Sequence, residues 1–268
     1  MKIEKLRKIV GYNREHLDEM YLLSRHFSGN NGINDEPYIN FVQMIRQALL
    51  NKKTILLYFP LKDMKIKALA MKSDYYKYIV INSNYSSSEM NFALAHEIYH
   101  LFYGEQSSFG HIELSDSYEH EYQEEMAASL FAGMILMPET DFVNKYKLFY
   151  EQSKDIGEVL VKLMSYYYVP YMSVLIRCLE LKLFRNNEDV SKLIDISEND
   201  LRNLFRKLWL DEGILNPDKR NDINNLKQLI TLNGDGYVKE GYLTNGDVEK
   251  SLKNIMAQYD ELTGEVYE

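Results

Sequence analysis

Residues 86–104 restrict the fold more than any other stretch, because they predict a long helix with ionisable side chains inside an apolar pattern. Ser86 followed by Glu89 is a capping-box signature, in which the hydroxyl and the carboxylate each satisfy a backbone N–H of the first helical turn. Apolar residues follow at helical spacing up to Gly104: Phe92, Ala95, Ile98, Tyr99 and Phe102. The run His-Glu-x-x-His at 96–100 lies inside this pattern, where ionisable groups without a purpose would carry a desolvation cost.

His96 and His100 lie four residues apart and therefore share one face of the predicted helix. Two imidazoles on one face can bind the same metal ion, and zinc is the usual partner of this pattern. Glu97 projects about 100° further round the helix. That position places a carboxylate beside the ion, where it can take a proton from an attacking water. The motif therefore predicts a hydrolytic zinc site with Glu97 as the catalytic base.

A catalytic zinc site needs a third protein ligand, and the downstream segment offers several candidates. Glu125 shares a predicted helix face with mostly small residues: Ala128, Ser129, Ala132 and Leu136. Glu124 lies on the neighbouring face and helical spacing alone does not exclude it. His111 and His120 are further alternatives, and Glu121 is a candidate for contact with a ligand rather than with the metal. Spacing leaves the choice open.

Residues 78–138 resemble the ImmA/IrrE family of metallopeptidases. The shared elements are a strand, Tyr-Ile-Val-Ile-Asn-Ser at 78–83, and a helix carrying Ala-His-Glu-x-x-His at 95–100. A second helix begins with a glutamate, continues with alanine-rich sequence and ends in Leu-Met-Pro at 136–138. The resemblance covers roughly residues 35–185 and includes Arg177 with the leucine spacing around it, whereas the region after 186 matches weakly.

The resemblance implies that Glu125 is the zinc-binding glutamate, by its distance from the Leu-Met-Pro element. It also implies one catalytic Zn²⁺ bound by His96, His100 and Glu125. Two positions depart from the family pattern: Ala127 stands where many members have a further acid, and Ser129 where asparagine is frequent. Both departures concern the surroundings of the ligands rather than the ligands themselves.

The remaining patterns predict an α+β fold that is mostly helical, with a small β-sheet packed on the helix that carries the motif. A strand is expected at 54–59 and a hairpin at 66–71 and 76–81. Helices are expected in the ranges 1–25, 38–50, 119–136, 156–166, 170–184, 197–211, 221–230 and 246–258. The pair 156–166 and 170–184 resembles a helix-turn-helix.

These patterns divide the chain into a metallopeptidase core at 1–140, a helical helix-turn-helix-like segment at 141–186 and a C-terminal, mostly helical domain at 187–268. A polar run that begins at Asn186 marks the second boundary. The helix-turn-helix-like pair has two readings, DNA binding or a packing and substrate-docking module. Its second helix offers only Arg177 and Lys182 as cations, too few for a recognition helix, so DNA binding is not expected.

Charge and composition limit the partners of the chain. With 268 residues and a net charge of -9, it is a poor default partner for nucleic acid. No apolar run reaches the length of a membrane span, and the N-terminus lacks a signal-peptide pattern, so no membrane association is expected. The single cysteine, Cys178, has the spacing of a buried apolar residue. A cytoplasmic location is the expectation, and the oligomeric state is left open.

The leading hypothesis is a zinc-dependent, site-specific endopeptidase. The resemblance implies that its protein substrate is a helix-turn-helix transcriptional repressor of a phage, a mobile element or a stress response. The alternative is a non-proteolytic binding or sensor module, for example part of a toxin–antitoxin pair, against which the intact Glu97 argues. General peptide hydrolysis is a third hypothesis. The group that would stabilise the oxyanion is open among Tyr99, His111 and His120.

Overall fold

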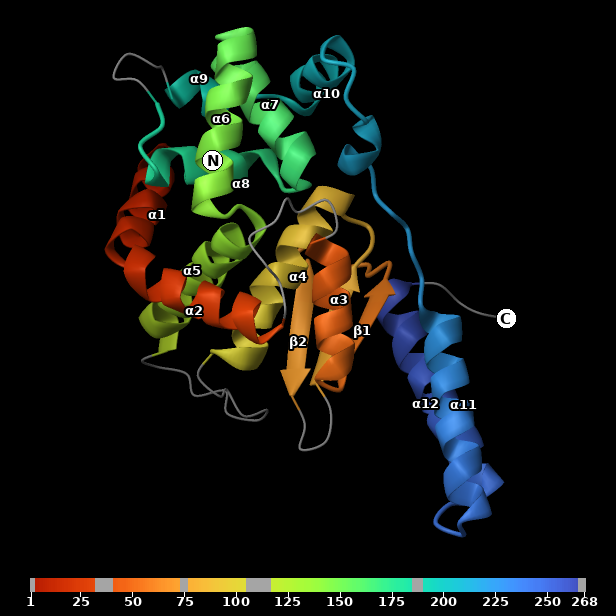
Figure 1. Ribbon diagram of the computed structural model, residues 1–268. Coiled ribbons are helices and arrows are strands. Elements are labelled where there is room, and N and C mark those ends of the chain that lie inside the picture. Colours follow the sequence, from red (N-terminus) through yellow and green to blue (C-terminus); the bar gives the residue numbers. More distant parts are fainter. Residues whose placement is uncertain (1–2, 32–40, 73–76, 105–116, 185–189, 265–268) are drawn as a thin grey trace.

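The computed structural model describes residues 3–31, 41–72, 77–104, 117–184 and 190–264, with the side chains of 41–43, 50–51 and 117–121 excepted. Within these ranges the chain forms a three-stranded sheet surrounded by helices (Figure 1). The elements are α1 (Ile3–Glu15), α2 (Leu17–Asn30), α3 (Phe41–Asn51), β1 (Thr54–Phe59), β2 (Ala68–Lys72), β3 (Lys77–Asn82), α4 (Ser87–Phe102), α5 (Ser117–Leu136), α6 (Glu139–Ser153), α7 (Ile156–Tyr167), α8 (Tyr171–Glu180), α9 (Val190–Ile194), α10 (Glu198–Lys207), the 3-10 helix η1 (Glu212–Leu215), α11 (Ile223–Lys239) and α12 (Asn245–Thr263). The predicted mostly helical α+β class is confirmed.

The sheet has the strand order β1-β3-β2. β1 pairs with β3 in parallel, and β2 pairs with β3 in antiparallel orientation, which confirms the predicted hairpin. β3 is central, and its Ile79 and Ile81 are completely buried. α4 packs against β2 and β3, so the sheet supports the helix that carries His96 and His100.

α4 begins where the capping signature predicts. The Ser86 hydroxyl accepts a hydrogen bond from the backbone N–H of Glu89 and donates one to its carboxylate at 3.0 Å. The helix ends at Phe102, after which the N–H groups of Tyr103 and Gly104 both donate to the carbonyl of Tyr99. The cap and the terminus determine which residues of α4 face the core and which face the site.

The predicted single helix at 1–25 is wrong, because the chain forms two helices that meet at His16. α1 packs against α8, where the buried Asn13 donates to the Glu180 carboxylate, whereas α2 packs mainly along α5. α1 also contacts α5, so the two helices share one partner and differ in the contact of α1 with α8. The break therefore has a tertiary cause that amphipathic spacing does not reveal.

The sequence patterns did not predict α6 as a separate helix. It begins directly after Pro138, and its first turn carries Glu139 and Asp141, which suit the positive end of the helix dipole. Only Phe142 and Tyr146 are buried along its length, so its apolar stripe is narrow.

α7 and α8 form the predicted helix-turn-helix-like pair. Tyr168, in the left-handed region at φ +53°, ends α7, and Pro170 precedes α8. The two helices are bent by 110° relative to each other, an angle typical of helix-turn-helix units.

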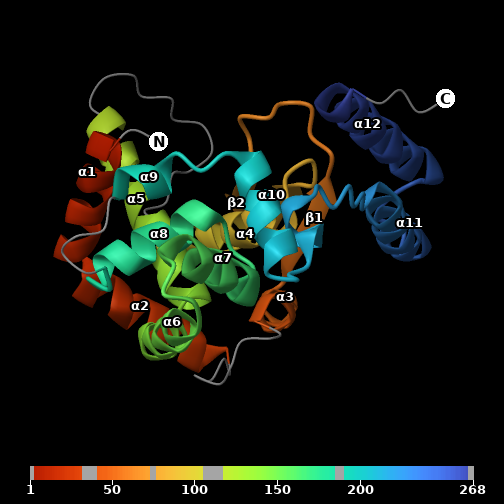
Figure 2. The ribbon, with the colours of Figure 1, turned by 90° about the horizontal axis from the view of Figure 1, so that it is seen from above.

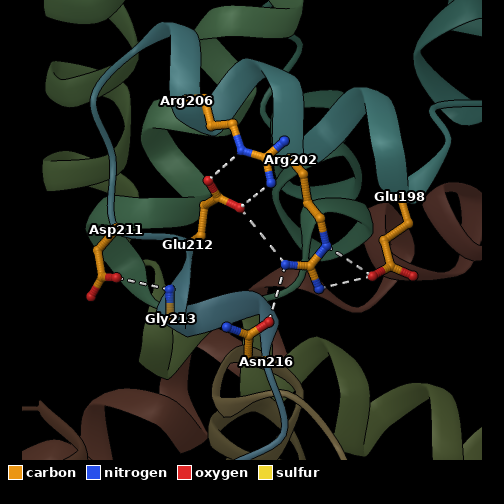
Figure 3. A network of polar contacts seen from close by, with 7 residues as sticks. All are labelled: Glu198, Arg202, Arg206, Asp211, Glu212, Gly213 and Asn216. Carbon is orange, nitrogen blue, oxygen red and sulfur yellow. Dashed lines mark hydrogen bonds and ion pairs between the residues drawn. The ribbon is translucent and has the colours of Figure 1, made fainter.

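Residues 190–215 return to the main core, where Ile194, Phe205 and Ile214 are buried. Salt bridges hold η1 to α10 (Figure 3): Arg206 binds both carboxylate oxygens of Glu212, at 2.8 and 3.1 Å. η1 in turn contacts α4. This segment therefore packs against the helix that carries the motif.

The chain then runs along the outer edge of β1, with hydrogen bonds in both directions between Tyr58 and the buried Asp222. Beyond it, α11 and α12 form an antiparallel pair that lies to one side of the body (Figure 2). A second small apolar cluster joins the base of this pair to the sheet: Leu57, Phe59, Leu61, Ile223 and Tyr259. The boundary predicted near residue 186 falls in 185–189, outside the described residues, and stays a prediction.

Among the described residues, no single helix is both long enough and apolar enough to cross a membrane. Two consecutive pairs, α5 with α6 and α7 with α8, meet that criterion only when each pair is joined, and they are bent by 66° and 110°.

We predict that Glu180→Ala lowers the free energy of unfolding by about 3 kcal/mol, because it leaves the buried Arg177 guanidinium and the Asn13 amide without their carboxylate partner. Urea unfolding checks the value. Glu151→Ala, which removes an exposed carboxylate from α6, is the control and should change stability by less than about 0.5 kcal/mol. A loss below about 1 kcal/mol for Glu180→Ala would contradict the assigned role of this ion pair.

Candidate metal centre

Two neighbouring helices bring three predicted site residues together. His96 and His100 project from α4, and Glu125 projects from the adjacent α5. The two histidine Nε2 atoms lie 3.1 Å apart. The Glu125 carboxylate lies 3.2 Å from Nε2 of His96 and 3.3 Å from Nε2 of His100.

The donor set fits a zinc ion. Zinc bound to nitrogen and oxygen at about 2.0–2.1 Å in tetrahedral geometry requires ligand atoms about 3.3 Å from one another. The two Nε2 atoms lie 3.1 Å apart, and each lies 3.2–3.3 Å from a different oxygen of the Glu125 carboxylate, so one ligand atom from each residue lies within 4.8 Å of the others, close enough to share one ion. Two neutral imidazoles with one carboxylate are also the chemistry of catalytic zinc sites that keep a fourth position for water or substrate.

The other ring nitrogens face α5 as well. Nδ1 of His100 lies 3.3 Å from the Glu124 carboxylate, and Nδ1 of His96 lies 3.3 Å from the Ser129 hydroxyl. Helical spacing alone does not decide whether Glu124 or Glu125 is the third metal ligand. The structure separates them, because Glu125 lies on the Nε2 side of both rings and Glu124 on the Nδ1 side of one.

Glu97 lies next to the histidine pair and is partly buried. Burial raises the pKa of its carboxyl group, an effect that the neighbouring His96 and His100 partly offset. A backbone hydrogen bond from Ala70, on β2, further stabilises the charged form. The carboxylate is thus held between the motif helix and the edge strand, with a proton affinity higher than that of an exposed glutamate.

The site is electrostatically coupled. Hydrogen bonds from His100 and His96 hold the pKa of Glu125 well below its usual range, although its side chain is partly exposed. Burial alone would lower the pKa of His100, but the hydrogen bond and charge of Glu125, together with Glu97 and Glu124, outweigh burial and raise it. The carboxylates around His100 therefore favour a cation in this position, either a proton or a metal ion.

The structure describes only one of the other predicted candidates. His111 and the side chains of His120 and Glu121 fall outside the described residues. Tyr99 is mostly buried beside His100, with ring centroids 5.8 Å apart, and it also packs against Phe131 of α5.

Three contacts of the site were not predicted from the sequence: Glu124 with His100, Ser129 with His96, and Ala70 with Glu97. The spacing of four residues between Glu125 and Ser129 was the available signal for one of them, since it puts both on the face that meets His96. The Ala70 contact involves only a backbone group, and no side-chain pattern could have shown it.

A comparison with protein families gives one match. The Peptidase_M78 family model, described as the IrrE N-terminal-like domain, matches residues 52–179. This range contains the sheet, the motif helix, the helix that bears Glu125, and the α7–α8 pair. No curated protein sequence matches the chain at a significant level.

We predict that the site binds zinc more weakly as the pH is lowered, because a proton on Nε2 of His100 competes with the metal. The raised pKa of His100 means that this competition begins at a higher pH than for an ordinary histidine. Affinity should be greatest above that pKa and should fall by up to about tenfold per pH unit below it. Competition with a chromophoric chelator between pH 8 and pH 6 measures the trend, and an unchanged affinity over this range would contradict the account.

Proposed function

We propose that the chain is a zinc-dependent, site-specific endopeptidase. The premise is that residues 52–179 match the IrrE N-terminal-like domain of a peptidase family, in agreement with the ImmA/IrrE resemblance. The observation that carries the proposal is the triangle of His96, His100 and Glu125, with a carboxylate from Glu97 beside it. Metal ligands together with a separate carboxylate base are what zinc-dependent peptide hydrolysis uses.

Zinc held by these residues would supply Lewis acidity for a water molecule and for the peptide carbonyl. The chain supplies the proton transfers. Glu97 accepts a proton from the attacking water on its carboxylate and passes it to the nitrogen of the leaving amine. Its burial raises its proton affinity, and the Ala70 N–H restricts its orientation, so both features suit this role.

The position of the edge strand β2 favours the binding of an extended peptide substrate. The carbonyl of Lys67 accepts from Asn82, so in this antiparallel pair the odd-numbered residues 67, 69 and 71 direct their backbone groups towards β3. Ala70 instead directs its N–H away from β3, to Glu97. An extended peptide added along this edge would therefore lie next to the proposed base.

The proposed substrate is a helix-turn-helix transcriptional repressor of a phage, a mobile element or a stress response, and a cytoplasmic location is proposed with it. Support for this step comes from the family resemblance. DNA binding by the chain itself is not proposed. Arg177 is one of the two cations in the second segment of the helix-turn-helix-like pair, 170–184, and it is buried and paired with Glu180.

We predict that Glu97→Gln retains zinc but cleaves the repressor at least about a hundredfold more slowly, because the amide keeps the shape of the side chain without its basicity. The substrate is a repressor-like protein encoded beside the chain, incubated with purified wild type, Glu97→Gln and the control Glu151→Ala. Cleavage by Glu97→Gln at the wild-type rate would exclude Glu97 as the base. Wild-type protein that takes up no zinc after metal loading would exclude the proposed activity altogether.

A further inference from the structure

The far nitrogens of the two histidines both meet polar atoms from α5. Glu124 lies 3.3 Å from Nδ1 of His100, and Ser129 lies 3.3 Å from Nδ1 of His96. An ionised carboxylate only accepts hydrogen bonds, so Nδ1 of His100 must carry the proton in this contact. With a zinc ion bound, the lone pair of the neutral ring would then be on Nε2, the nitrogen that lies beside Glu125.

α5 therefore contacts both sides of the histidine pair. Glu125 and Ser129 lie four residues apart on one helix face, and they meet opposite edges of the His96 ring. Glu124 lies about 100° round the helix from Glu125 and reaches the Nδ1 edge of His100. Each imidazole thus lies between the Glu125 carboxylate, which could bind the same metal ion, and a polar atom of Glu124 or Ser129, which could orient the ring.

The end of α4 leaves room for the Glu124 carboxylate. A Cβ atom added to Gly104 would lie 2.5 Å from Oε1 of Glu124, closer than any real Cβ contact allows. It would also lie 3.0 Å from Cα and from the carbonyl oxygen of His100. A glycine at this position keeps the carboxylate within reach of the ring, and any side chain there would displace it.

From these contacts we infer that Glu124 and Ser129 are positioning residues, which fix the ring orientations of His100 and His96, and that Gly104 makes the Glu124 contact sterically possible. The inference rests on the proposed zinc site and extends it to residues that do not touch the metal. A hydrogen-bonded carboxylate makes an imidazole a stronger ligand than a hydroxyl does, so Glu124 has the larger effect.

Zinc affinity, measured by competition with a chromophoric chelator, tests the inference. Glu124→Ala should bind zinc about 10- to 100-fold more weakly than wild type, in the range found for partners of metal-binding histidines. Glu124→Gln, which keeps an acceptor oxygen, should recover part of the loss, and Ser129→Ala should lose less than Glu124→Ala. The control Glu151→Ala removes an equal charge from an exposed site and should bind within about twofold of wild type.

The protonation of the rings gives a second readout that needs no metal. Nitrogen-15 NMR of the imidazoles in the metal-free wild type should show a hydrogen-bonded Nδ1 in each ring. Glu124→Ala should change the His100 signals and leave those of His96 in place, whereas Ser129→Ala should do the reverse. A general loosening of the helices would move both sets together and would contradict the inference.

A double-mutant cycle tests the role of Gly104. Gly104→Ala should weaken zinc binding in the wild-type background and have much less effect in the Glu124→Ala background, because the displaced carboxylate is already absent. Equal effects in both backgrounds would mean that Gly104 acts through the helix backbone and not through Glu124.

The outcomes separate this inference from the proposed function. Zinc binding by the wild type with unchanged affinity in Glu124→Ala overturns the inference and leaves the proposed activity intact. Absence of zinc binding by the wild type overturns the proposed activity, and the NMR spectra of the metal-free protein then decide the positioning of the rings on their own.

Discussion

The packing of α4 against α5 brings two imidazole nitrogens and a carboxylate within 3.3 Å of one another, and the functional account depends on this contact. When Nδ1 of each neutral ring carries the proton, the two Nε2 lone pairs point at each other across 3.1 Å. Such an arrangement is electrostatically unfavourable unless a cation lies among these atoms. The raised pKa of His100 expresses the same preference for positive charge.

The rest of the fold holds these two helices in place. Small residues on α5, among them the fully buried Ala128 and Ala132, suit a close approach of neighbouring backbones. The buried Arg177 donates to the carbonyl of Met137 at the end of α5, and its partner Glu180 connects the same network to α1. The sheet supports α4 from another side, and its edge strand orients Glu97. The packing of regions distant in sequence thus keeps the site residues in position.

Local patterns predicted much of this arrangement. The N-cap at Ser86, the β2–β3 hairpin and the α7–α8 pair are confirmed because each depends on residues close in sequence, although the Glu89 carboxylate accepts from the Ser86 hydroxyl and not from a backbone N–H. The choice between Glu124 and Glu125 could not be made from spacing, since both faces of α5 were compatible with a metal and only the position of α4 distinguishes them. The break at His16 has the same origin, because contacts with α8 and α5 cause it and neither is visible in the local sequence.

Anomalous diffraction at the zinc absorption edge, from crystals of the zinc-loaded protein, tests the central claim most directly. The account predicts a peak about 2.0–2.2 Å from Nε2 of His96, from Nε2 of His100 and from a carboxylate oxygen of Glu125. A zinc peak that lacks any of these three contacts, or a loaded crystal with no zinc between α4 and α5, would contradict it.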